Sequence, residues 1–140
     1  MMESRTISEL LVNRAKKNPD QVAIIVDGAG SEDNRMTYRE WDRKTNIMAR
    51  EIYLSGVAPG DRVAVLFSNR ESIAFLIAYF AIHKAGGVVV PVNTRLTASE
   101  INYILSNSGA VGMIAESLLL PTLEEARNEL PAEPWLTGLV

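Results

Sequence analysis

Few side chains in this sequence have the type and spacing that catalysis or metal binding requires. The chain contains one histidine, His83, and no cysteine, so disulfides, thiolate metal ligands and cysteine nucleophiles are excluded. His83 lies beside Lys84 near the end of a predicted helix, where the helix dipole favours positive charge. Because neither a second histidine nor a nucleophile pattern accompanies it, we favour a structural role over catalysis. We therefore predict no catalytic residue and no metal site.

Two short polar segments follow apolar ones and are the better candidates for binding. Residues 63–67 and 88–90 are apolar without alternation, which predicts strands covered on both faces of a parallel sheet. The segments 68–70 and 93–95 come next, with the sequences SNR and NTR. A doubly wound sheet binds ligands outside the C-terminal ends of its strands, where the strand order reverses. We expect these two segments to lie there.

Each polar candidate has a functional and a structural interpretation. Arg95 could hold an anion or be an ordinary surface arginine. Asn69 and Asn93 could contact a ligand, although hydrogen bonds to nearby backbone are the simpler interpretation. Glu124 and Glu125 could act as paired carboxylates, but on a polar helix face they are better explained as solvated charge.

The elements that must position these residues form an alternating pattern. An apolar helix over residues 72–85, ended by two glycines, connects the two apolar strands, and parallel strands require such a crossover. Three Thr-x-x-Glu capping boxes predict helix starts at Thr6, Thr37 and Thr97. With another strand over residues 111–115, the pattern predicts an α/β fold with a parallel βαβαβ sheet flanked by helices.

The ends of the chain are less regular. Residues 22–26 read as a strand that turns into a polar loop ending near Asn34. Residues 123–130 predict a helix, and the apolar segment 135–140 has no partner that we can assign.

Composition narrows the class of protein. With 140 residues, 47% of them hydrophobic, one domain is expected. A net charge of -3 with scattered basic residues disfavours nucleic acid. The N-terminus carries no apolar run long enough for a signal peptide, so we expect a cytoplasmic protein. Residues 73–92 have the length of a membrane span, but Lys84 at their middle costs about 3 kcal/mol on insertion scales, so we predict a buried core segment.

Five segments together resemble a known family. In order they are MTYREW (36–41), PGDRVAV (59–65), KAGGVVVPVN (84–93), RLT (95–97) and NSGA (107–110). Their order and spacing resemble the start of the AMP-forming acyl-CoA synthetases, which belong to the adenylate-forming ligases together with luciferases and peptide-synthetase adenylation domains. The resemblance runs from the first helix to about Ala115.

The resemblance implies a two-step reaction, and it implies that most of the residues for this reaction are not in this sequence. A carboxylate attacks the α-phosphate of ATP to give an acyl-adenylate and pyrophosphate, and the thiol of coenzyme A then displaces AMP, with magnesium neutralising phosphate charge. The family's glycine-rich phosphate loop, Thr-Glu motif, ribose-binding aspartate and C-terminal lysine have no counterparts in this sequence. We therefore expect residues 1–140 to be a partial N-terminal subdomain, inactive and without bound cofactor by itself. Arg95 resembles an arginine that some members place near the nucleotide end of coenzyme A.

Two alternatives belong to other classes. The chain could be a free-standing interaction module derived from such a ligase, pairing with itself or with a partner through an exposed apolar surface. A small nucleotide-binding sensor is disfavoured, because the sequence contains neither G-x-G-x-x-G nor G-x-x-x-x-G-K-[ST]. We expect the remainder of a ligase chain as the main partner, with a homodimer as the other outcome.

Overall fold

The computed structural model describes residues 6–27, 34–128 and 136–139. Its helices are α1 (Ile7–Lys17), α2 (Tyr38–Leu54), α3 (Ser72–Lys84), α4 (Ala98–Ser108) and α5 (Leu120–Arg127), with short 3-10 turns η2 (Asn69–Glu71) and η3 (Ser117–Leu119). Its strands are β1 (Val22–Ile25), β2 (Arg35–Thr37), β3 (Arg62–Leu66), β4 (Val88–Pro91), β5 (Gly112–Ala115) and β6 (Leu136–Leu139).

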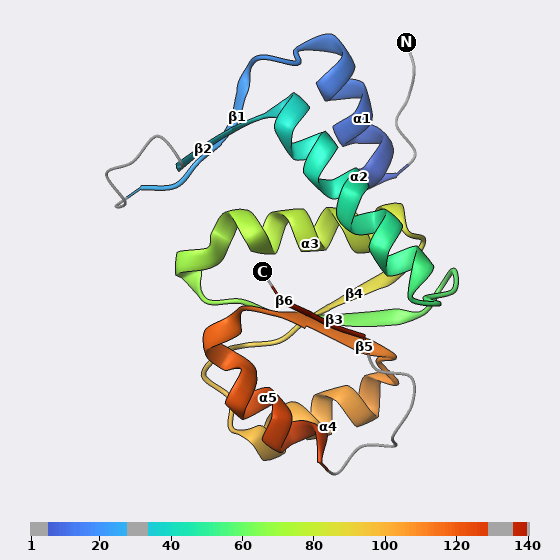
Figure 1. The fold of residues 1–140 in the computed structure, drawn as a ribbon, viewed down its shortest axis with the longest axis vertical. Coiled ribbons are helices and arrows are strands. Elements are labelled where there is room, and N and C mark those ends of the chain that lie inside the picture. The colour runs from blue at the N-terminus through green and yellow to red at the C-terminus, as the bar shows by residue number, and fades with distance from the viewer. Residues whose placement is uncertain (1–5, 28–33, 129–135, 140) are drawn as a thin grey trace.

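The main sheet is parallel and has the order β4-β3-β5-β6. Helix α3 covers one face, and α4 and α5 cover the other (Figure 1). The predicted α/β fold with a parallel βαβαβ sheet is therefore confirmed. Strand β6 adds a fourth strand to it: its backbone pairs with β5, so the segment 135–140 has a partner over residues 136–139. Residues 135 and 140 lie outside the described residues.

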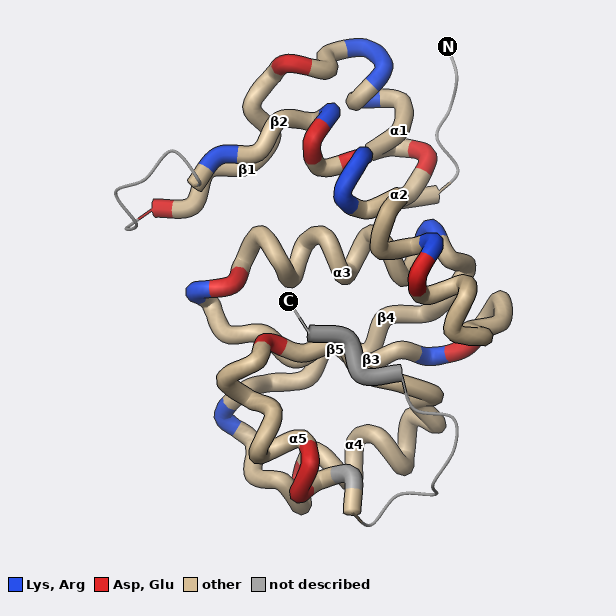
Figure 2. The backbone as a smooth tube through the Cα atoms, in the orientation of Figure 1, with Lys and Arg blue, Asp and Glu red and all other residues tan. Residues whose placement is uncertain are grey.

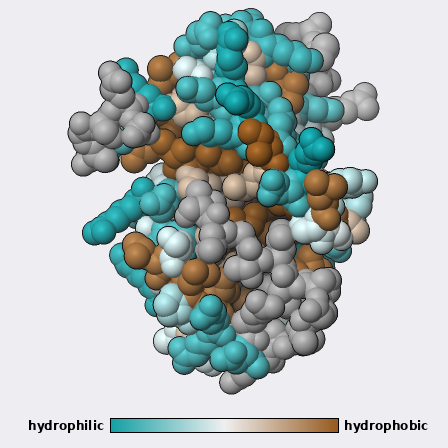
Figure 3. All heavy atoms as spheres, viewed as in Figure 1, coloured by the Kyte–Doolittle hydropathy of each residue, from teal (hydrophilic) through white to brown (hydrophobic). Residues whose placement is uncertain are grey.

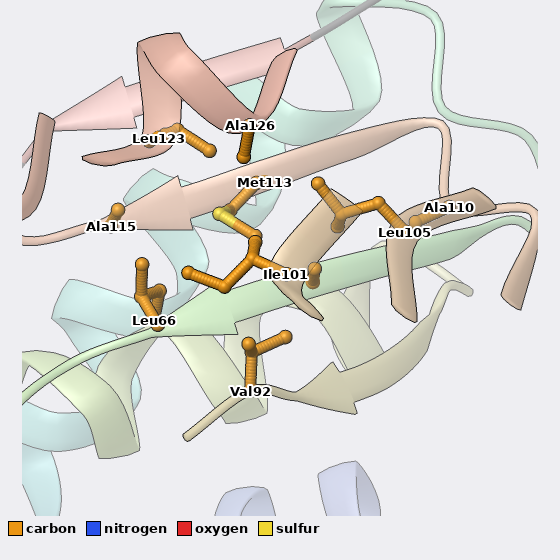
Figure 4. Packing of buried hydrophobic residues seen from close by; sticks show 10 residues of the cluster. Leu66, Val92, Ile101, Leu105, Ala110, Met113, Ala115, Leu123 and Ala126 are labelled. Carbon is orange, nitrogen blue, oxygen red and sulfur yellow. The ribbon is translucent and has the colours of Figure 1, made fainter. Parts of the chain in front are cut away.

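Both faces of the sheet are covered, which explains the apolar strands without alternation. Val63 and Val65 pack among residues of α2 and α3, such as Ile52 and Ile82. Ala64 and Leu66 belong to the cluster on the opposite face. There Leu66 and Met113 lie close to Ile101 and Leu105 of α4, and Leu123 and Ala126 of α5 close the cluster (Figure 4). Successive strand residues thus alternate between two cores.

All three predicted capping boxes are present and start α1, α2 and α4. In each, the glutamate amide donates to the threonine hydroxyl three residues earlier, over 3.1 to 3.3 Å. The glutamate carboxylate in turn accepts from the threonine amide, over 2.8 to 3.1 Å. Two backbone donors without an intrahelical partner are satisfied at each start.

Several predicted ends are shifted by one residue, and two elements, β2 and α5, differ by more. Residues 35–37 form β2, which pairs antiparallel with β1; this strand was not predicted, because it is three residues long and its last residue also caps α2. Helix α5 begins at Leu120 rather than at 123, with Pro121 in its first turn, where a proline costs no hydrogen bond. The predicted end of this helix at 130, and the loop residues 28–33, lie outside the described residues.

The two glycines after α3 have separate roles. Gly86 has φ 86°, a left-handed conformation that side chains rarely adopt. Gly87 lies where a Cβ would come within 2.9 Å of Ile82 Cγ2 and 3.2 Å of the Asp61 carbonyl. The chain can therefore enter β4 tightly against α3. This helix lies in the core as predicted, and within the described residues no helix is both long and apolar enough to cross a membrane.

Candidate functional site

The strand order reverses between β3 and β5. The crossover through α3 places β4 on one side of β3, and the next crossover through α4 places β5 on the other. In such sheets, ligands bind outside the carboxyl ends of the strands at this switch point. The sequence prediction paired the ends of β3 and β4 and is wrong on this point. The ends that meet at the switch point carry Ser68 and Glu116.

A buried carboxylate fills this position. Glu116 directly follows β5 and is 4% exposed. Its Oε2 atom accepts hydrogen bonds from the Ser68 amide (3.0 Å) and the Ser68 hydroxyl (2.9 Å). Its own amide donates to the Leu66 carbonyl over 3.1 Å. These hydrogen bonds tie the turn after β3 to the end of β5.

Sequence reasoning missed Glu116. One signal was available: an acidic residue placed directly after an apolar strand, at the end of the sheet where ligands bind.

Arg95 lies at the same edge of the sheet, after β4. Its side chain is exposed, and among the described residues it forms no ion pair. Its amide donates to Asn93 Oδ1 over 2.9 Å, so Asn93 makes the local bond that was the simpler interpretation. Asn69 is exposed, and its carbonyl accepts a hydrogen bond from the Ser72 hydroxyl over 2.6 Å. The backbone of Arg95 is thus held by Asn93, and its guanidinium forms no ion pair with any residue that the structure describes.

His83 lies in the last turn of α3, in a partly buried position. Its Nε2 atom is buried and has no hydrogen-bond partner among the described residues, and its ring lies 5.0 Å from that of Tyr79. Burial lowers the pKa of His83, because a charged imidazolium would lose its hydration there. Burial thus opposes the helix dipole, which favours a positive charge at this end of α3.

The buried cation of this region is Lys84. Its ammonium donates to Asp42 Oδ1 (2.5 Å), Thr45 Oγ1 (2.8 Å) and Asn46 Oδ1 (2.8 Å). The side chain is 8% exposed, and Thr45 is fully buried. Since each N–H of the ammonium has an acceptor, Lys84 joins α3 to α2 and has no capacity left for a ligand.

The other acidic candidates do not form a site. Glu124 and Glu125 are exposed on α5. A cleft of about 90 Å³ lies between α4 and α5, lined by Ala98, Ser99, Asn102, Glu125 and Ala126, well below the 300 to 1,000 Å³ typical of ligand pockets. Within the part of the chain that the structure describes, no three acidic or histidine residues are grouped to hold a metal ion. Acidic and basic residues are interspersed along the backbone (Figure 2).

Comparisons with known proteins agree with this fold. The AMP-binding enzyme family matches residues 11–137. The long-chain fatty acid–CoA ligase FadD13 of Mycobacterium tuberculosis is 36% identical over 125 residues, which are 89% of this chain and 24% of that ligase. Gramicidin S synthase 2 of Brevibacillus brevis is 33% identical over 96% of this chain and 3% of its own length.

Solved structures of related proteins are also similar to this chain. The N-terminal domain of FACL13 from Mycobacterium tuberculosis, solved with an inhibitor, superposes with a TM-score of 0.81 at 33% identity. The superposition covers 96% of this chain and 34% of that domain. The chain thus spans about a quarter of the fatty acid–CoA ligase and a small part of the peptide synthetase. The family match covers most of the sequence and shows that the chain belongs to the AMP-binding enzyme family.

Proposed function

We propose that this chain is the N-terminal portion of an ATP-dependent acyl-CoA ligase of fatty acid metabolism. The observation that carries the proposal is its 36% identity to a fatty acid–CoA ligase over 89% of the chain. In the proposed reaction, a carboxylate oxygen of the acid attacks the α-phosphorus of ATP and pyrophosphate leaves. The sulfur of coenzyme A then attacks the acyl carbon, and AMP leaves.

The chain's own contribution would be a contact to coenzyme A. Arg95 is exposed at a strand end, its backbone is held by Asn93, and its guanidinium is unpaired within the described residues. A guanidinium suits phosphate because it can donate two parallel hydrogen bonds. We assign Arg95 to the nucleotide end of coenzyme A. ATP and magnesium would be held by other parts of the longer enzyme, since neither phosphate-binding glycine loop is in this sequence.

A binding experiment tests the role of Arg95. Coenzyme A is titrated into the 140-residue chain and followed by calorimetry, with pantetheine, which lacks phosphate, as the control ligand. Arg95→Ala should weaken coenzyme A binding, whereas Arg39→Ala should not, because Arg39 is paired with Asp20 on another part of the surface. Equal affinity of wild type and Arg95→Ala would refute the assignment.

An activity experiment tests the rest of the proposal. With ATP, magnesium and a fatty acid, the 140-residue chain should release no AMP, whereas a protein extended by the coding sequence that follows Val140 should release it. AMP release by the short chain would contradict the proposed inactivity. A stop codon directly after Val140 would contradict the ligase function of this gene product.

The proposed partner is the remainder of the ligase chain, with a homodimer as the alternative for an interaction module. Several large apolar side chains are exposed, among them Tyr53 (67%), Leu54 (70%) and Leu118 (81%), and hydrophobic residues are visible between hydrophilic ones on the face in Figure 3. Sedimentation velocity over a range of concentrations separates the two. A monomer supports an excised subdomain, and a concentration-dependent dimer supports the module.

A further inference from the structure

We propose that the exposed face of α2 is a self-complementary surface through which two copies of this chain pair, with their α2 helices parallel and side by side. The inference goes beyond the proposed function, because it names the surface of a homodimer and needs no ligase reaction. A ligase chain that contains α2 can pair in the same way, so the proposed function and this inference are tested separately.

An apolar stripe runs along the outer face of α2. The inner face of the helix is covered, since Thr45, Ala49 and Ile52 are buried, and α2 lies outside α3 (Figure 1). On the outer face, Ile47 and Leu54 are 55% and 70% exposed. They are seven residues apart, close to two helical turns, so both lie on one stripe. Apolar residues at this spacing form the seam between paired helices.

Charges of opposite sign flank this stripe. The residues four before and three after Ile47 lie on one side of it, and both are arginines, Arg43 and Arg50. The residue four after Ile47, Glu51, lies on the other side. These three charged side chains are exposed and form no ion pair with any residue that the structure describes. They are therefore available to a second molecule.

The two charged sides determine how two copies are oriented. When identical helices pack face to face and parallel about a two-fold axis, each side of one helix meets the opposite side of the other. Arg50 of each copy is then about 1.5 Å along the axis from Glu51 of the second copy, while Ile47 and Leu54 each meet their own counterparts. An antiparallel pair would bring the two arginine sides together. Charge complementarity therefore selects the parallel pair.

The cost of pairing is low, because α2 is already folded and packed on α3 before the second copy arrives. Lys44 lies on the same side as Glu51, but its charge is attracted to Glu40 of its own helix. The contact is limited to one helix of 17 residues. We therefore expect a weak, concentration-dependent dimer at the small end of specific interfaces.

The first experiment is sedimentation velocity of the 140-residue chain from about 1 μM to 1 mM. Wild type should dimerise as its concentration rises. Ile47→Asp should weaken pairing at least about tenfold, because two like charges would meet at the axis. Tyr103→Asp is the matched control and should pair like wild type, since Tyr103 is 68% exposed but belongs to α4. Circular dichroism verifies that each variant is folded.

A charge exchange tests both the partner and the direction of the helices. Arg50→Glu and Glu51→Arg should each stay monomeric at concentrations where wild type pairs. An equimolar mixture of the two variants should pair, because each supplies the charge that the other has lost. The double variant with both substitutions should pair as well. Tighter pairing of Arg50→Glu alone would contradict the parallel arrangement.

These outcomes are independent of AMP release, which decides the proposed function. Wild type that is monomeric at the highest concentration refutes the α2 surface. A dimer that persists in both Ile47→Asp and Arg50→Glu refutes it too, as does one that is also lost in Tyr103→Asp. If the mixed variants stay monomeric, Arg50 does not pair with Glu51 of a second copy and the inference is wrong.

Discussion

Replacing Lys84 with methionine should lower the free energy of unfolding by about 2–3 kcal/mol, even though methionine preserves most of the side-chain volume. Breaking a fully buried ion pair costs about 3–5 kcal/mol, because the remaining charge stays buried without a partner. The Asp42 side chain is 23% exposed and regains part of its hydration, which places the cost below that range. The Thr45 hydroxyl keeps its bond to the Asp42 carbonyl (2.8 Å) and adds little.

The assay is urea unfolding followed by circular dichroism and by tryptophan fluorescence. Trp41 is a suitable reporter, because its ring packs edge to face on Phe80 of α3 with centroids 4.5 Å apart. The matched control is Arg39→Met, whose pair with Asp20 is 63% and 84% exposed and should contribute no more than about 1 kcal/mol.

The result that refutes this reasoning is a Lys84→Met variant no less stable than Arg39→Met. A second variant tests the physical cause. Asp42→Asn added to Lys84→Met removes the carboxylate left without its partner, so the double variant should be more stable than Lys84→Met alone. If the double variant loses the sum of the two single costs, the unpaired charge is not the cause.

Three further predictions concern stability. Gly87→Ala should lower the melting temperature and destabilise by about 1–3 kcal/mol, because its Cβ would overlap Ile82 Cγ2. The Thr97 amide and hydroxyl lower the pKa of Glu100, so wild type should lose stability as the pH falls below 4.5, and Glu100→Gln should lose less in acid titrations. Burial lowers the pKa of His83, so the unfolded chain binds the extra proton and stability should fall below pH 6.5; His83→Gln should remove this dependence.

The sequence predicted most reliably those features that depend only on residues close together in the chain. Each capping box lies within four residues and satisfies its own backbone donors, so Thr6, Thr37 and Thr97 mark helix starts without knowledge of the rest of the fold. The apolar strands were predicted equally well, because a strand that is covered on both faces consists of consecutive apolar residues without polar positions between them. The strands that the sequence predicted least well are β2 and β6. They are three and four residues long and are defined mainly by the strands with which they pair.

The candidate site was less predictable because it depends on which strands become neighbours. Two parallel strands joined by a helix can lie side by side, but the sequence does not say on which side the third strand will insert. The order β4-β3-β5 brings Glu116 to Ser68, which is 48 residues away in the chain. The lowered pKa of His83 could not be predicted from the sequence either, because it results from burial in the folded chain. The helix dipole, in contrast, is a local effect that the sequence does indicate.

Lys84 and Glu116 have one physical feature in common. Each is a mostly buried charge whose hydrogen bonds connect elements far apart in sequence: Lys84 joins α3 to α2, and Glu116 joins the end of β5 to the turn after β3. Apolar contacts tolerate small sliding movements, whereas a buried charge loses its partners when the elements shift. These two buried charges therefore restrict how α2, α3 and the ends of β3 and β5 can shift relative to one another.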